Sequence, residues 1–290
     1  MSATVQTQLA RDADFLGRTR ELLSRSISRL SSGNRLVSAS DDPAGNSLAE
    51  KLSAQKLRLA AASTNVQNAV SFVQSVDGFL SGMGNLLNRM SELAVLAKDP
   101  MKNAGDIELY QLEFQQLQTQ IRNTIGGSTA DIGGTQDISR PMGSFNGREL
   151  FGANPDGLAV ATGQAATQRM IIPETNLREG PMLSIFQQDA SGQFTLSVTD
   201  PAAVDTIVQS LAQIADHRAT LGGVGSRLEL VAKGITTERE NLTSAISKIT
   251  DIDVATESTR IARIGMLAEA ATAMLTQGTK TQESVLRLLV

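Results

Sequence analysis

The sequence contains no cysteine and no tryptophan, and aromatic residues make up only 3% of its 290 residues. Without cysteine the chain has no disulfide framework, no thiolate nucleophile and no cysteine-ligated metal. With so few aromatic rings it also lacks a stacking platform for nucleic-acid bases. The core must therefore be built from Leu, Ile, Val, Met and Ala side chains.

Strong net charge and long apolar runs are absent as well. The formal net charge is -4 and the pI is near 5.2, which gives no general attraction to nucleic acid. Nowhere do about 18 apolar residues run together, as a membrane-spanning helix needs. The first residues of the chain lack the apolar stretch of a secretory signal. Composition alone therefore favours a soluble, cytosolic protein.

Residues that could perform chemistry are few. The single histidine, His217, cannot belong to a Cys/His pair or to a site with several histidine ligands. The acidic groups Asp41-Asp42 and Asp251-Ile-Asp253 lack the spacing of a calcium loop or a zincin helix. We interpret these aspartates as helix caps or salt-bridge partners. The sequence thus predicts no catalytic, cofactor-binding or metal site, and the protein is not expected to be an enzyme.

A heptad pattern of apolar residues runs through the first half of the chain. One heptad position holds Val66, Val73, Leu80, Leu87 and Ala94, and the position three residues later holds Ala69, Val76, Met83, Met90 and Ala97. This pattern predicts a long helix that packs against another helix. Asp99, Pro100 and Gly105 should end it, and a second apolar stripe predicts a further helix that stops at Gly126 and Gly127. Because the connection is short, these two helices should pack antiparallel.

The second half of the chain repeats the heptad pattern. One position holds Ile207, Ile214, Leu221, Leu228, Ile235, Leu242 and Ile249. At 1.5 Å per residue the two long helices would span roughly 50 and 75 Å, which predicts a rod built from both halves of the chain. The glycines within residues 222–225 lack the Lys-Ser/Thr ending of a phosphate loop, so we interpret them as a helix break or a close-packing point.

Both ends of the chain carry weaker amphipathic patterns. Leu16, Leu23, Ile27 and Leu30 predict an N-terminal helix that stops at Gly33. A C-terminal stripe that starts at Ile261 and Ile264 predicts a second helix, which Gly278 separates from an apolar cluster at residues 285–290. Both segments are rich in Ala, Ser and Thr, so each should be marginally stable alone and ordered when many copies pack together.

Six arginines give the N-terminal segment a basic character, with Asp12, Asp14 and Glu21 among them. The six arginines are Arg11, Arg18, Arg20, Arg25, Arg29 and Arg35. Two interpretations stay open: a solvated helix face, or contact with acidic groups on a neighbouring copy.

The middle of the chain favours short strands. Residues alternate between apolar and polar at Leu158, Val160 and Thr162 and again over 194–198, and residues 170–172 form a short apolar run. Turns are expected at Asn146-Gly147 and over 155–157. The fold class is therefore mainly α, with a helical coiled-coil rod from both halves and a small β-rich insert. The expected divisions are 1–44 and 251–290 as N- and C-terminal inner-core segments, 45–140 and 201–250 as the two parts of the rod, and 141–200 as the insert.

Several blocks of the sequence closely resemble bacterial flagellins. At the N-terminal end they are R-L-S-S-G at 29–33, S-A-S-D-D at 38–42, N-R-M-S-E-L-A at 88–94 and F-N-G-R-E-L-F at 145–151. At the C-terminal end they are I-T-D-I-D-V-A-T-E at 249–257, A-A-T-A-M-L-T-Q at 270–277 and E-S-V-L-R-L-L at 283–289. The resemblance covers about residues 20–150 and 200–290.

The resemblance to flagellins implies a structural subunit that polymerises into the bacterial flagellar filament and serves swimming motility. It implies terminal segments paired in an inner coiled-coil core, with termini that order on assembly. It also implies export by the flagellar type III apparatus, with an export chaperone, the filament cap and hook-junction proteins as partners. The location would then be extracellular, without a cleaved signal peptide.

The resemblance further implies a surface at Arg89, Leu93 and Glu113 that either a Toll-like flagellin receptor or a neighbouring subunit contacts. Pro43 after Asp41-Asp42 is typical of the related hook-filament junction proteins, which gives the alternative function. An enzyme or signalling protein with a coiled-coil stalk, and a surface adhesin, are the remaining alternatives.

Overall fold

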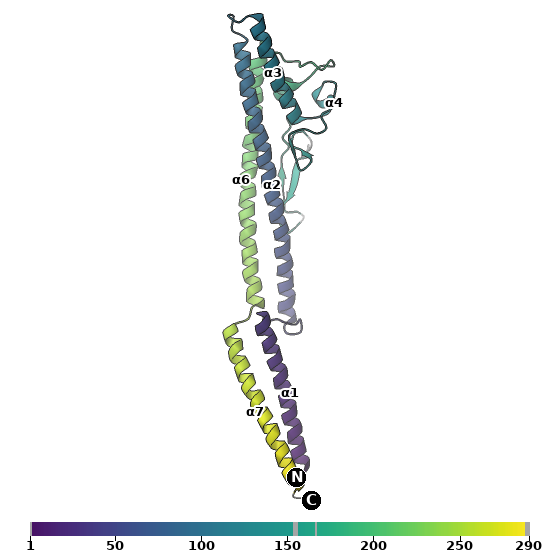
Figure 1. Cartoon of the computed structure of the whole chain (residues 1–290), viewed down its shortest axis with the longest axis vertical. Helices are drawn as coiled ribbons and strands as arrows, with labels where there is room; N and C mark the ends of the chain where they lie inside the picture. Colours follow the sequence, from purple (N-terminus) through teal and green to yellow (C-terminus); the bar gives the residue numbers. More distant parts are fainter. Residues whose placement is uncertain (1, 153–155, 166, 288–290) are drawn as a thin grey trace. The chain divides into compact units, whose positions relative to one another are not determined.

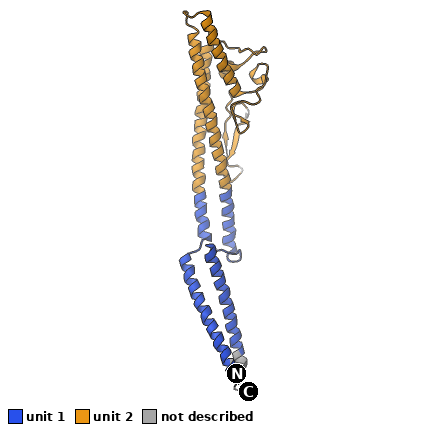
Figure 2. Cartoon of the chain, viewed as in Figure 1, with its two compact units in different colours: residues 1–57, 239–290 blue, residues 58–238 orange. Residues whose placement is uncertain are grey.

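The computed structural model describes residues 2–152, 156–165 and 167–287. These residues form two compact units, and Figure 2 shows them in different colours. Unit 1 combines Met1–Leu57 with Arg239–Val290, and unit 2 comprises Arg58–Glu238. Each unit therefore has its own packing.

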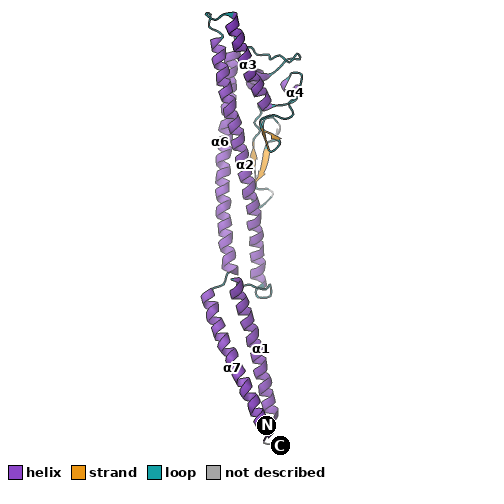
Figure 3. Cartoon of the chain, viewed as in Figure 1, coloured by secondary structure: helices purple, strands orange, loops and turns teal. Residues whose placement is uncertain are grey.

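The chain is mainly α-helical, as the sequence predicts, and Figure 3 shows how small the share of strand is. The helices are α1 (Ser2–Ser32), α2 (Pro43–Leu96), α3 (Ala104–Ile125), α4 (Thr129–Ile132), α5 (Gly180–Phe186), α6 (Ala203–Thr250) and α7 (Val254–Arg287). The strands are β1 (Ser144–Phe145), β2 (Arg148–Glu149), β3 (Leu158–Ala161) and β4 (Arg169–Ile172).

Unit 2 has a core of apolar residues from its long helices, which Figure 1 shows alongside one another. All ten heptad residues predicted between Val66 and Ala97 are buried. They meet α6, whose heptad residues Ile207, Ile214, Leu221, Leu228 and Ile235 are buried too. Ion pairs add to this packing at the surface, because Arg218 lies 2.7 Å from Asp77 and joins α6 to α2. The predicted coiled-coil seam is therefore confirmed in unit 2, whereas the last two predicted heptad residues, Leu242 and Ile249, belong to unit 1 and are only half-buried.

Helix α3 follows α2 after a short loop, and its start is well defined. Asn103 accepts a hydrogen bond from the Asp106 N–H at 2.9 Å while its own N–H donates to the Asp106 carboxylate at 3.3 Å. This reciprocal arrangement is a capping box. The helix ends at Gly126, whose φ of 64° suits glycine, as predicted.

Two separate antiparallel strand pairs form the β part of unit 2. Strands β1 and β2 pair around the turn at Asn146 and Gly147, as predicted. Strand β3 pairs with β4, in the register Leu158 to Ile172. The other predicted turn includes Pro155, which lies outside the described residues, and β3 does not pair with β2.

The strand predicted over residues 194–198 does not form, which corrects the expectation. The side chains of Leu196 and Val198 point inward as the alternation predicts, and both are buried. However, the backbone groups here bond to side chains of α3. The Val198 N–H donates to Gln111 at 2.8 Å, and the Leu196 carbonyl accepts from Gln118 at 3.0 Å.

Two further corrections concern glycines inside helices. Helix α6 continues through residues 222–225 without a break. Only Gly225 in this run is near another segment, since a Cβ there would lie 3.7 Å from Val73. Helix α7 likewise continues through Gly278, where a Cβ would lie 3.4 Å from Leu9 of α1. In both helices, packing of neighbouring residues outweighs the cost of about 1 kcal/mol per helical glycine.

Unit 1 is organised around α1 and α7, which lie side by side (Figure 1). The first and last helices of the chain are thus partners. The side chains they bury between them are few and mostly small or polar, with Thr19 and Ser26 from α1 and Ile264 and Ala271 from α7.

Candidate assembly surface

Large apolar side chains remain exposed on the outside of the α1 and α7 pair. Their exposed fractions are 50% for Phe15, 43% for Leu22, 51% for Ile27, 68% for Met266, 44% for Leu267 and 64% for Met274. Large apolar side chains left exposed on both helices of a pair indicate an interaction surface. Full burial of each such side chain contributes about 1.5–3 kcal/mol.

Hydrogen bonds tie the segment that follows α1 to the end of α6 and to the connection between α6 and α7. The Ile252 N–H donates to the Gly33 carbonyl at 3.1 Å, and the Arg35 N–H donates to the Thr250 carbonyl at 2.6 Å. The Arg35 guanidinium adds a bond from Nη2 to the Ile249 carbonyl at 2.8 Å. The two sequence signatures at opposite ends of the chain therefore meet in one place.

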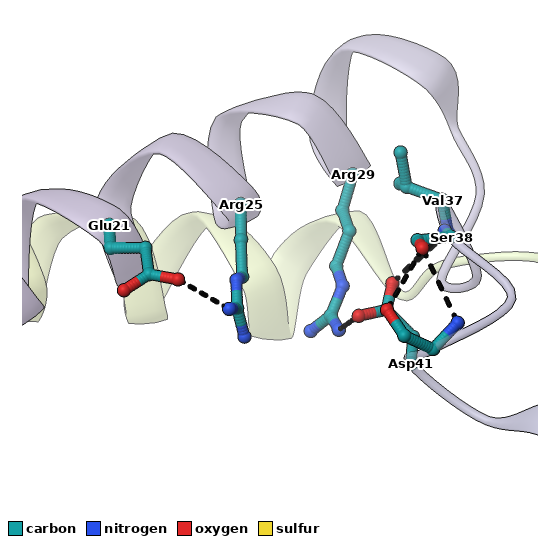
Figure 4. Close-up of polar contacts among 7 residues, drawn as sticks. Glu21, Arg25, Arg29, Val37, Ser38 and Asp41 are labelled. Carbon is teal, nitrogen blue, oxygen red and sulfur yellow. Dashed lines mark hydrogen bonds and ion pairs between the residues drawn. The ribbon is translucent and has the colours of Figure 1, made fainter.

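The loop between α1 and α2 is held by one carboxylate, which Figure 4 shows in close-up. An oxygen of Asp41 accepts the backbone N–H groups of Val37 and Ser38, each at 3.3 Å. The other oxygen lies 3.4 Å from a guanidinium nitrogen of Arg29. Sequence reasoning proposed a salt-bridge role for Asp41, and Arg29 of the basic stretch is the partner it did not identify.

These contacts lower the pKa of Asp41 below its ordinary value of 3.8. The hydrogen bond from the Val37 N–H lowers it most, desolvation opposes the lowering, and Ser38 and Arg29 add to it. A lowered carboxyl pKa contributes stability above the ordinary value, and that stability is lost as the pH falls through the lowered pKa.

We therefore expect Asp41→Asn to loosen the loop at neutral pH, because the amide holds neither the charge nor both acceptors. Amide hydrogen exchange of Val37 and Ser38 should be faster in the variant at pH 7, and the difference should disappear as the pH falls below 3.8. Asp12→Asn on α1 is the matched control and should leave both amides unchanged. Equal exchange of the two amides in wild type and Asp41→Asn at pH 7 would contradict this role.

Two other aspartates are helix caps, as predicted. Asp42 precedes α2 and accepts the Gly45 N–H at 2.9 Å. Asp253 precedes α7 and accepts the N–H groups of Ala255 and Thr256 at 3.0 and 3.2 Å. The side-chain and backbone bonds from Thr256, with a weaker contribution from Ala255, lower the pKa of Asp253. The negative charges therefore stand at helix N-termini, where the helix dipole favours them.

The three residues singled out by family resemblance lie in unit 2. The Arg89 guanidinium forms two bonds to the Glu113 carboxylate, at 2.7 and 3.1 Å, and another to Glu92 at 3.0 Å. The hydrogen bond from Arg89 lowers the pKa of Glu113. The hydrogen bonds to Glu113 and Glu92 raise the pKa of Arg89. Arg89 and Glu113 are partly exposed, whereas Leu93 is fully buried. A protein at this surface would thus meet the ion pair and not the Leu93 side chain.

No group of three or more histidine, aspartate or glutamate side chains that could hold a metal occurs among the described residues. Within the same residues, no helix is long and apolar enough to cross a membrane.

Comparisons with known proteins agree on one family. Residues 6–132 match the model of the bacterial flagellin N-terminal helical region, and residues 204–289 match that of the C-terminal helical region. Flagellin FlaB2 of Treponema pallidum (strain Nichols) is 31% identical, with 94% of both chains covered. The flagellar filament 33 kDa core protein of Treponema phagedenis is 30% identical, also with 94% of both chains covered. Flagellin of Bacillus subtilis (strain 168) is 30% identical, with 91% of this chain and 92% of the relative covered. None of these three names supports the junction-protein alternative.

Proposed function

This chain belongs to the bacterial flagellin family and is a structural subunit of the flagellar filament, and on that premise we propose how its copies assemble. The exposed apolar side chains of α1 and α7 become buried against other copies in the core of the filament. The observation that carries this proposal is the set of large apolar side chains left exposed on a helix pair that fully buries few of its own side chains. Burial between copies removes that surface from water.

In this scheme the chain is divided by role. Residues 1–44 and 251–290 form the inner core, residues 45–140 and 201–250 form the rod, and residues 141–200 form a small insert. Each subunit contacts the next through two different surfaces, and these heterologous contacts do not close into a ring. Repetition of such a contact builds a helical polymer. The filament serves swimming by turning rotation of its base into thrust, and no residue performs chemistry.

The path to the filament is also part of the proposal. The chain travels unfolded through the flagellar type III export apparatus, guided by an export chaperone, and joins the filament outside the cell beneath a cap. Hook-junction proteins form the base on which the first copies add. Absence of cysteine suits this path, since no disulfide can form during it. A blocked type III apparatus should leave the protein inside the cell, and its appearance in the medium would contradict this route.

The surface at Arg89, Leu93 and Glu113 is proposed as a contact for a Toll-like flagellin receptor or for a neighbouring subunit, with the exposed Arg89 and Glu113 pair as the part that a partner would touch. Double substitution by alanine separates the two. A loss of receptor binding with normal filaments supports the receptor, a loss of filaments supports the subunit contact, and no change in either contradicts both.

Electron microscopy of the purified chain after seeding, with circular dichroism before and after, tests the proposed assembly. Long uniform filaments, with a gain in helix as the termini order, are expected. Short caps on existing filament ends without polymer would instead favour the junction protein.

A further inference from the structure

Charge is unevenly divided between the terminal helices and the rest of the chain. Ser2–Ser32 and Val254–Arg287 together hold nine arginine and lysine residues against six aspartate and glutamate residues, although the whole chain has a net charge of -4. When many copies bring these helices together, they also bring together an excess of positive charge. Guanidinium groups at such a contact need acidic groups opposite them.

One exposed stripe of α1 alternates arginine with apolar residues. It consists of Arg11, Phe15, Arg18, Leu22 and Arg25, at alternating spacings of four and three residues. All five side chains are exposed, and the residues that α1 buries, Thr19 and Ser26, belong to a different stripe. Arg18 and Arg25 form ion pairs with Asp14 and Glu21 of the same helix, at 2.9 and 2.5 Å. Arg11 has no ion pair among the described residues.

An exposed stripe of α7 has the complementary pattern. It consists of Met266, Glu269, Ala273, Thr276, Lys280 and Glu283, at alternating spacings of three and four residues. Glu269 and Glu283 have no ion pair among the residues that the structure describes. Lys280 is the one residue of this stripe with the same charge as the α1 arginines. It occupies the same heptad position as Met266 and Ala273.

The two stripes match in spacing as well as in charge. Arg11 and Arg25 are fourteen residues apart, and so are Glu269 and Glu283, which corresponds to about 21 Å along a helix in both cases. Residues at heptad spacing stay on one side of packed helices, where charged residues pair across the contact. With Arg11 opposite Glu269 and Arg25 opposite Glu283, Phe15 would lie against Ala273 and Leu22 against the methylene stem of Lys280.

We propose that the α1 stripe of one copy docks against the α7 stripe of a neighbouring copy in the filament, with Arg11 and Arg25 opposite Glu269 and Glu283. This contact rests on the proposed function, and it assigns a direction to lateral packing because α1 and α7 form its two different sides. Assembly should weaken as salt screens the charges.

Charge reversal tests the contact in the full-length chain. Arg11→Glu with Arg25→Glu, and separately Glu269→Arg with Glu283→Arg, should each raise the critical concentration for assembly on the order of tenfold at low salt, because attraction becomes repulsion. The chain with all four changes should assemble close to the wild-type concentration. An equimolar mixture of the two double variants should also assemble, since each then offers a complementary stripe to the other. Circular dichroism of each unassembled variant checks that its helix content equals that of the unassembled wild-type chain.

Arg20→Glu is the matched control, because Arg20 is exposed on α1 outside the stripe. It should leave the critical concentration unchanged at low salt. If the double variants assemble like the wild type, or if Arg20→Glu impairs assembly as strongly as they do, the stripe contact is overturned while the proposed filament function stands. If the wild-type chain itself forms no filaments, the proposed function fails instead.

Discussion

A chain that ends at Val254 is expected to fold unit 2 and to form no filaments. Removal of residues 255–290 eliminates nearly all of α7, so α1 loses the helix beside it and the exposed Met266, Leu267 and Met274 are lost. Unit 2 comprises Arg58–Glu238 and keeps its heptad core. Seeded assembly followed by electron microscopy measures the loss, and thermal unfolding by circular dichroism shows whether unit 2 remains cooperative.

A gentler pair of substitutions separates the surface from the helix that carries it. Leu267→Glu with Met274→Glu keeps α7 but places charges on its exposed apolar flank, and assembly should fall by at least two orders of magnitude if both side chains are buried between copies. Thr272 is also exposed on α7 but lies outside this apolar flank, so Thr272→Glu is the control. Filaments from the truncated chain would show that α7 is dispensable and would overturn the proposed core.

Arg122→Met should cause the largest loss of stability within unit 2. The Arg122 side chain is buried and donates to the carbonyls of Ile132 at 2.7 Å, Gly133 at 2.6 Å and Phe186 at 3.3 Å. These carbonyls lie at the C-terminal ends of α4 and α5, where a cation is favoured. Burial lowers the pKa of Arg122 because water no longer solvates the guanidinium fully. Methionine would leave buried acceptors without a donor, at a cost of roughly 3 kcal/mol or more.

Thermal or urea unfolding measures this loss, which corresponds to a fall in Tm on the order of 10 °C for a unit of this size. The Tm of Arg122→Lys should lie between those of the wild type and Arg122→Met, because an ammonium cannot reach all three carbonyls with the geometry of a guanidinium. Arg140→Met at an exposed position should change the free energy of unfolding by less than about 0.5 kcal/mol. An unchanged midpoint for Arg122→Met would show that the short helices are held by other contacts.

The sequence predicted the parts of the fold that depend on local pattern. The apolar heptads from Val66 to Ala97 became a buried seam, and Asn146-Gly147 became a hairpin turn, because both signals lie within a few neighbouring residues. The candidate surface was also foreseeable, since the weak amphipathic patterns at Leu16 and Ile264 were too poor in bulk to close a core alone.

The failures depend on residues far apart in the chain. Alternation at residues 194–198 predicted a strand, but Gln111 and Gln118 of α3 took the hydrogen bonds that a partner strand would have made. Residues 222–225 remained helical because Leu221 and Val224 pack into the core on that side of α6. Arg122 gave no signal in the sequence, since its partners are backbone carbonyls whose positions only the fold reveals.

The pairing of α1 with α7 also has a consequence for the order of folding. Helix α1 precedes α7 by more than 200 residues, so their pairing closes a loop of that length and needs α7 to have been synthesised. Contacts of such long sequence separation form late, after the local contacts of unit 2. A chain in which this loop has not yet closed therefore lacks the complete surface, and polymerisation is delayed by chain topology alone.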